Sequence, residues 1–172
     1  DAVTGKIVNR GDAEIRDIKT RDARLAGGLR LAGDPIHDML LRLVVDERLT
    51  IVEAGSETRW MPYPGLCNNH GDAYGALVGL NLLKGFRAAL KERLGGSQGC
   101  THLTELAQVL PTAVIQAFAG EVIDTREDSE HKPFQLDRCH ALRSDGEAVK
   151  LFYPRWYRGS PDPAAVPSPP ET

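Results

Sequence analysis

The chain has 172 residues, 41% of them hydrophobic and 26% charged, which is typical of a globular domain with a core and not of a disordered chain. A net charge of −3 at pH 7 argues against nucleic acid as a partner, because nucleic-acid-binding surfaces are strongly basic. No apolar run approaches the roughly 20 residues that span a bilayer, so no membrane partner is expected either.

The three cysteines, at positions 67, 100 and 139, are an odd number and lie far apart in the chain. A small secreted domain held together by disulfides carries more cysteines at closer spacing. We therefore expect three free thiols and a cytoplasmic protein.

The first part of the chain predicts strands. Residues 3–8 form a short strand, residues 9–20 a polar stretch and residues 25–33 a glycine-rich, irregular segment. Residues 39–45 and 50–58 predict a hairpin whose turn is "DERL". Because residues 39–45 are almost continuously apolar, we expect this strand to be covered on both faces.

The middle of the chain predicts helices. Asp72 is placed to cap the segment that follows it. Apolar residues at helical spacing predict a helix over 82–94, which ends at the glycine pair 95–96. A second helix is expected to begin near Thr101, and Pro111 should kink it because proline lacks the N–H group. The predicted buried face of this helix comprises Leu103, Leu106, Leu110, Val114 and Ala117.

The last part of the chain predicts another hairpin, with strands over 134–143 and 148–157. Residues 159–172 are rich in proline, alanine and serine without periodicity, which indicates a disordered tail. Together these elements predict one α+β domain over residues 1–158, in which an antiparallel sheet has helices packed on one face.

Residues that can carry chemistry stand at the ends of the predicted elements. His37 and Asp38 lie where a strand begins, Cys67 follows the paired strand, and Cys100 and His102 open a helix. A strand end, a loop and a helix N-terminus can converge on one pocket. Thiolate and imidazole groups suit Zn²⁺ or Fe. Cys100 is also a candidate thiolate, because the partial positive charge at a helix N-terminus stabilises that form.

Each of these residues also has a simpler interpretation. His102 can merely occupy the first turn of its helix, and Cys67 can be an inert loop residue. Cys139 is expected to be a buried small hydrophobe, with His140 facing the other way on the same strand. The sequence has no C-x-x-C pair, phosphate-binding loop, dinucleotide fingerprint, G-x-S-x-G or H-E-x-x-H motif.

Several stretches resemble the bacterial family DUF2889. They are "GDPIHDMLLRLVVDERLTIVEA", "YPGLC", "LVGLNLLKGF", "ERLGGSQGCTHLTEL" and "DRCHALRSDG", followed by "YPRWY". The resemblance extends to about Arg158 and is weaker before Asp34. Members of that family occur beside genes for the catabolism of aromatic or other hydrophobic compounds, which implies a role of that kind here.

The order of elements is also similar to that of NifU-type iron–sulfur scaffold proteins, whose fold, like that of SufE-type proteins, is an α+β arrangement. This resemblance implies that Asp38, Cys67, Cys100 and His102 converge, although the last two occur in reversed order. His37 stands beside Asp38, and the scaffold's cysteine two residues before the aspartate is missing. That difference argues against a labile cluster, which favours thiolates.

The favoured hypothesis is a small enzyme that cleaves a hydrophobic or aromatic compound by lyase-type, acid–base chemistry. His37 or His102 would move the proton, because imidazole titrates near neutral pH. Asp38 would orient that imidazole, and Glu105, one helical turn beyond His102, would share its face. The substrate would be bound by Trp60, Tyr63, Cys67 and Cys100.

The main alternative is a metal- or iron–sulfur-handling protein, in which a Zn or Fe ion is bound by His37, Asp38, Cys67 and His102. The acid–base hypothesis needs no cofactor. A binding module without chemistry is the third hypothesis, and a homo-oligomer is compatible with all three.

Overall fold

The computed structural model describes residues 8–70 and 72–159, and the chain divides into two units, Asp1–Phe118 and Ala119–Thr172. The first unit holds the main sheet and the two longer helices, whereas the second holds one short helix and turns. The predicted single domain over 1–158 spans both units. The predicted tail over 159–172 lies, except for Gly159, outside the described residues.

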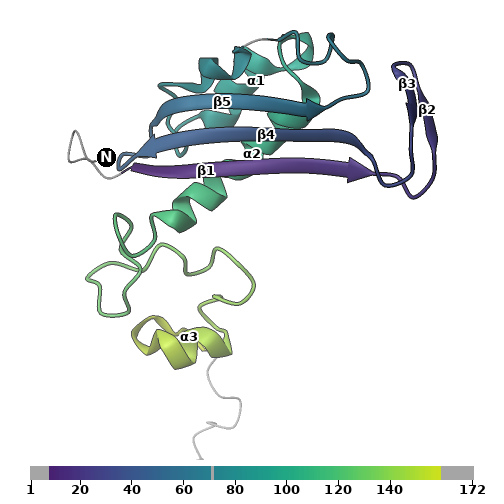
Figure 1. Cartoon of the computed structure of the whole chain (residues 1–172). Helices are drawn as coiled ribbons and strands as arrows, with labels where there is room; N and C mark the ends of the chain where they lie inside the picture. Colours follow the sequence, from purple (N-terminus) through teal and green to yellow (C-terminus); the bar gives the residue numbers. More distant parts are fainter. Residues whose placement is uncertain (1–7, 71, 160–172) are drawn as a thin grey trace, which may run out of the picture. The chain divides into compact units, whose positions relative to one another are not determined.

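An antiparallel sheet of three strands forms the centre of the first unit, in the order β1–β4–β5 (Figure 1). The strands are β1 (Val8–Ile18), β4 (Pro35–Asp46) and β5 (Ile51–Trp60). The predicted hairpin over 39–45 and 50–58 is confirmed within β4 and β5. Its turn is held by the Asp46 carboxylate, which accepts the backbone N–H groups of Arg48 at 3.0 Å and Thr50 at 2.9 Å.

Strand β1 occupies most of the stretch 9–20, where no strand was predicted. Its even positions from Arg10 to Arg16 are charged and exposed, and its odd positions from Gly11 to Ile15 are half-buried. This is the period of two expected for a strand with one solvent face. The pattern was missed because two of the inward residues are Gly11 and Ala13, which add little hydrophobicity. Of the strand predicted over 3–8, all but Val8 lies outside the described residues.

A small two-stranded hairpin follows, made by β2 (Ala23–Leu25) and β3 (Gly28–Arg30). The segment 25–33 was predicted to be irregular, and this prediction is wrong for the residues of β3. Gly28 has a φ of 119°, a backbone conformation that side chains rarely adopt, which explains the glycine in this tight turn.

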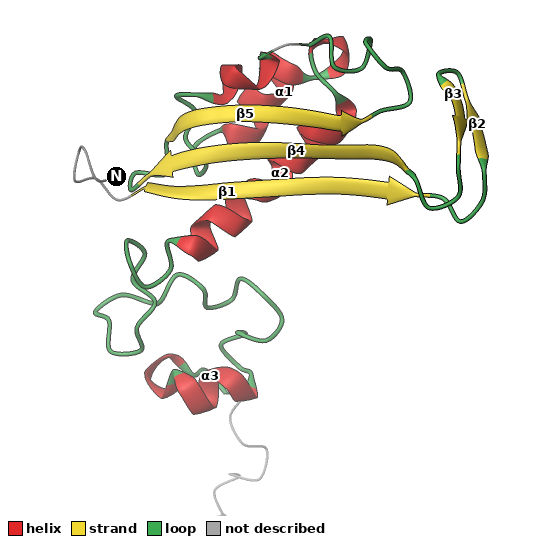
Figure 2. Ribbon diagram, viewed as in Figure 1, coloured by secondary structure: helices red, strands yellow, loops and turns green. Residues whose placement is uncertain are grey.

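The helices of the first unit pack on one face of the sheet (Figure 2), which confirms the predicted α+β fold. They are η1 (Ala73–Leu77), α1 (Phe86–Leu94), η2 (Gly96–Gln98) and α2 (Thr101–Ala117). The start of α2 is as predicted, and the helix runs through Pro111. Helix α1 begins four residues later than expected, and the Asp72 side chain makes no capping hydrogen bond.

The core lies between this sheet face and the helices. Leu103, Leu110 and Val114 of α2 are buried as predicted, but Leu106 and Ala117 are not. The remaining core residues include Met39, Leu41, Leu43 and Val45 of β4, Tyr74 and Leu77 of η1, Phe86 and Leu90 of α1, and Ala107 and Phe118.

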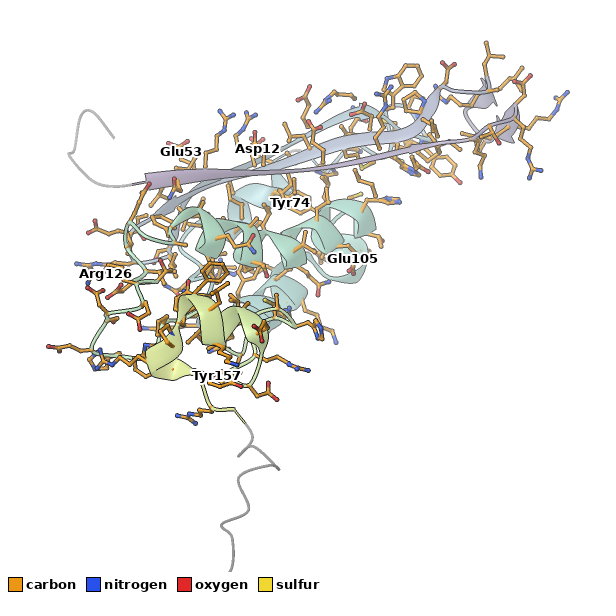
Figure 3. The ribbon with its side chains drawn as sticks, turned by 90° about the horizontal axis from the view of Figure 1, so that it is seen from below. Asp12, Glu53, Tyr74, Glu105, Arg126 and Tyr157 are labelled. Atoms are coloured by element: carbon orange, nitrogen blue, oxygen red, sulfur yellow. The ribbon has the colours of Figure 1, made fainter. Side chains whose placement is uncertain are left out.

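The other face of the sheet is polar, so the prediction that β4 is covered on both faces is wrong. Arg42 is exposed there and pairs with Asp12 at 3.0 Å. Figure 3 shows Asp12 and Glu53 on this side of the sheet and Tyr74 on the helix side. Leu40 is only 7% exposed on this face, since its strand neighbours by register are Glu14 and Glu57, whose long side chains flank it.

The second unit contains α3 (Glu147–Phe152) and η3 (Pro154–Trp156), so the predicted hairpin over 134–143 and 148–157 is wrong. Asp137 has a φ of 60°, and its carboxylate accepts both the backbone N–H and the hydroxyl of Ser144. The Lys132 ammonium and these Ser144 hydrogen bonds hold the pKa of Asp137 well below its usual range. A turn built in this way replaces the first predicted strand. Cys139, predicted to be buried, is exposed.

No helix within the described residues is both long enough and apolar enough to cross a membrane.

Candidate active site

Three element ends meet on the helix-covered face of the sheet. The end of β1 contributes Asp17, the start of β4 contributes His37, and the first turn of α2 contributes His102. Asp17 and His37 are direct partners in the register of the sheet. The rings of His37 and His102 lie with their centroids 4.1 Å apart and their planes inclined by 38°. The two histidines singled out in the sequence are therefore neighbours.

The orientation of His37 is set by Asp17. The Asp17 carboxylate lies 2.9 Å from His37 Nδ1, and the same oxygen accepts the His37 backbone N–H at 2.6 Å. A carboxylate can only accept, so this contact places a proton on Nδ1 and leaves Nε2 as the atom that exchanges protons. The His37 side chain is 14% exposed, which leaves it within reach of a small molecule.

His102 sits where its neutral form is favoured. Burial lowers the pKa of His102 below its usual value of 6.5, and the neighbouring His37 lowers it further. The Asp17 carboxylate acts in the opposite direction, but less strongly. At neutral pH the His102 ring is therefore uncharged and can act as a base.

Cys100 immediately precedes α2 and contacts His102. Its Sγ lies 3.8 Å from His102 Nδ1 and 3.9 Å from Met39 Sδ. Cys100 also lines a cavity of about 390 Å³. The cavity is lined by Leu66, Cys67, Asn69, His70, Ser97, Gly99 and Cys100. Cys67 and Cys100 are therefore brought to the same cavity, as the sequence predicted.

Tyr74 holds the start of α2 in place. Its hydroxyl accepts the Cys100 N–H at 3.1 Å and lies 2.8 Å from the Cys100 carbonyl oxygen and 2.9 Å from Thr104 Oγ1. The residue is only 1% exposed, and burial raises the pKa of its phenol, which keeps the donor proton in place. Sequence reasoning missed Tyr74, since a tyrosine among apolar residues at helical spacing is indistinguishable from a core residue.

Asp38 does not belong to this site. Successive residues of a strand point to opposite faces, so Asp38 lies on the sheet face away from His37. There it pairs with Arg59 at 3.1 Å and with Arg16 at 3.6 Å. The orienting carboxylate predicted at Asp38 is supplied by Asp17 instead.

Glu105 lies elsewhere as well. It is exposed and lines a groove between α1 and α2 with Arg87 and Lys91, a groove whose lining does not include His102. Figure 3 shows Glu105 on the outer side of its helix. The prediction that His102 and Glu105 share one face of the helix is therefore wrong.

The two predicted aromatic substrate contacts do not line the Cys100 cavity. Trp60 lies against Arg30, whose guanidinium carbon is 4.6 Å from the ring centroid. Tyr63 is 49% exposed, and its carbonyl oxygen accepts the N–H groups of Leu66 and Cys67. Its role is therefore to shape the turn that carries Cys67.

The four predicted metal ligands do not lie on one face of the sheet. Asp38 faces away from His37, His102 and Cys67. Within residues 8–70 and 72–159, no three His, Cys, Asp or Glu side chains are grouped closely enough to bind a metal ion.

The family model described as "Protein of unknown function (DUF2889)" matches residues 8–116. The chain belongs to the DUF2889 family. The DUF2889 match begins well before Asp34, where the resemblance was expected to weaken, and it ends before the second unit. It includes Asp17, His37, Cys100 and His102, so every group of the site lies in the family region.

No curated protein and no solved structure matches this DUF2889 chain significantly. The likeness to NifU-type proteins therefore stays a prediction.

Proposed function

We propose that this DUF2889 chain is a small cytoplasmic enzyme that cleaves a hydrophobic or aromatic compound by lyase-type, acid–base chemistry. The observation that carries the proposal is the contact between the His37 and His102 rings, whose centroids lie 4.1 Å apart. Two imidazolium ions at this separation repel each other, so one ring is neutral when the other is charged. Such a pair supplies a base and an acid together.

The surroundings assign the two roles. His102 is the base, because burial and the nearby His37 lower its pKa. The acid role falls to His37, because the Asp17 carboxylate 2.9 Å from Nδ1 holds the ring in place and leaves Nε2 as the atom that gives the proton. In a lyase step, His102 would take a proton from the substrate while His37 Nε2 gives one to the leaving oxygen or carbon. The protons then balance without a cofactor.

The proposed substrate is small and partly apolar. Met39 contacts Cys100 beside His102, and the adjacent cavity of about 390 Å³ is lined by Leu66 and two cysteines beside its polar groups. An aromatic ring with one hydroxyl or carboxyl substituent fits this mixed lining. The cytoplasmic setting is proposed because Cys67, Cys100 and Cys139 are all free thiols.

The proposal is tested by incubating the protein with a panel of aromatic hydroxy acids and following bond cleavage by mass spectrometry. General acid–base catalysis contributes about 10²–10⁴-fold, so His37→Ala and His102→Ala should each lower turnover by about that factor. His140→Ala is the matched control, since His140 is exposed in the second unit. Equal turnover in all three variants would contradict the proposal.

A further inference from the structure

The acid–base pair does not use the thiol of Cys100, which contacts His102. The Cys100 Sγ lies 3.8 Å from His102 Nδ1, and the residue lines the cavity of about 390 Å³. A cysteine that touches an imidazole and also lines a cavity has the arrangement of a nucleophile with its base. Cys67 lines the same cavity.

We propose that Cys100 is a nucleophile that accepts an acyl group from an activated ester or thioester, with His102 as its general base. This reaction shares His102 with the acid–base proposal but does not depend on it. The substrate class follows from the chemistry, because a thiol activated by imidazole attacks carbonyl carbon and releases a good leaving group.

Hydrogen bonds from Tyr74 hold the backbone of Cys100 in place beside the cavity. The Tyr74 hydroxyl bonds both the N–H and the carbonyl oxygen of Cys100, at 3.1 and 2.8 Å. The preceding residue, Gly99, also lines the cavity, and a Cβ added there would lie 2.8 Å from the Leu94 carbonyl oxygen. A residue other than glycine would therefore have to displace the backbone next to Cys100.

The first turn of α2 provides stabilisation for the charge that develops. The N–H groups of Thr101 and His102 belong to the first turn, where no carbonyl of the same helix accepts them. They are therefore available as donors to an oxyanion formed next to Cys100 Sγ.

The reaction balances with water as the only co-reactant. His102 Nδ1 takes the thiol proton as Sγ bonds to the carbonyl carbon. The alcohol or thiol leaves with that proton, and Cys100 keeps the acyl group as a thioester. A water molecule, deprotonated by His102, then attacks this thioester, which releases a carboxylic acid and restores the thiol.

The test uses p-nitrophenyl acetate as the acyl donor with the full chain, and measures nitrophenolate release together with the acetylated peptide. We expect a burst of about one equivalent and a single acetyl group on Cys100. His102→Ala should slow this acetylation by about 10²-fold. The exposed Cys139 reports the reactivity of an ordinary thiol in the same molecule.

Acetylation of Cys100 no faster than that of Cys139 would overturn the proposal, and so would an unchanged Cys100 rate in His102→Ala. Should His102→Ala fail to fold, His102→Gln replaces it. The ratio of the acetylation rates of Cys100 and Cys139 in the unsubstituted protein then tests the same proposal. The measurement involves no lyase substrate, so its failure leaves the acid–base proposal standing.

Discussion

Asp17 is the residue that distinguishes the observed site from the one expected from the sequence. Asp38 is adjacent to His37 in the chain, but Asp17 is adjacent to it across the sheet. Its carboxylate makes two contacts to His37, one with the ring and one with the backbone. The proton that His37 donates therefore depends on a residue 20 positions away.

We predict that Asp17→Asn lowers turnover by about 10–10²-fold, which is less than the loss of the imidazole itself. The amide oxygen can still accept a hydrogen bond from His37, but a neutral amide is a weaker acceptor than a carboxylate and holds the ring less firmly. Asp38→Asn is the matched control, because the same change on the other sheet face removes only the ion pairs with Arg16 and Arg59. Steady-state rates of both variants are the measurement. A larger loss of turnover in Asp38→Asn than in Asp17→Asn would show that Asp38 is the carboxylate that supports His37.

A second residue-scale prediction concerns Cys67 and metal. Because Asp38 is turned away from the histidines and Cys67, we expect protein purified without oxygen or chelator to hold less than one equivalent of tightly bound Zn or Fe. Cys67→Ser should keep its melting temperature, since the residue lies in a loop. Elemental analysis by mass spectrometry is the measurement. Stoichiometric metal that disappears in Cys67→Ser would favour the metal-handling alternative.

At the scale of elements, the site depends on the central strand β4, whose inward residues pack against α2. Leu43 is fully buried in this strand and pairs with Gly11 and Ala54. We predict that Leu43→Ala lowers the free energy of unfolding by about 2–5 kcal/mol, because it leaves a cavity that the core cannot fill. Val52→Ala on the neighbouring strand β5 is the control, because Val52 is exposed. Chemical denaturation measures both, and equal losses would contradict this assignment.

The elements that could be predicted are those with strong local signals. The β4–β5 hairpin has an apolar run and a turn with a suitable acceptor, Asp46, and α2 begins where a glycine-rich segment meets an apolar period. Strand β1 was missed because Gly11 and Ala13 fill its inward positions. A Cβ at Gly11 would lie 3.0 Å from a methyl group of Val114 of α2, so any larger residue there would press on this helix. That requirement comes from packing and is invisible in the local sequence.

The same distinction applies to the site. The sequence pointed to His37, Cys100 and His102 because chemically capable residues stood at element ends. It could not identify Asp17, since that residue is defined by the register of a strand that was not recognised. Nor could it place Asp38 correctly, because which face a strand residue occupies depends on what covers the sheet.

At the scale of the whole molecule, the DUF2889 region and the first unit coincide closely, ending at residues 116 and 118. All groups of the candidate site lie within this region. Residues 119–159 carry their own polar network, in which Gln135 Nε2 donates to the Thr125 carbonyl and to the Tyr153 hydroxyl. The proposed chemistry is therefore a property of the first unit, and homo-oligomer formation stays a prediction.

The central claim is that His37 and His102 act as one coupled acid–base pair, and an NMR titration of the two imidazoles tests it most directly. We predict that His102 titrates below 6.5, and that His37→Gln moves it upward. It should stay below 6.5 in that variant, because burial is the larger cause of the shift. His140→Gln serves as the control and should leave the His102 titration unchanged. A His102 pKa unaffected by His37→Gln would show that the rings do not interact, and either that result or a His102 pKa at or above 6.5 would contradict the account.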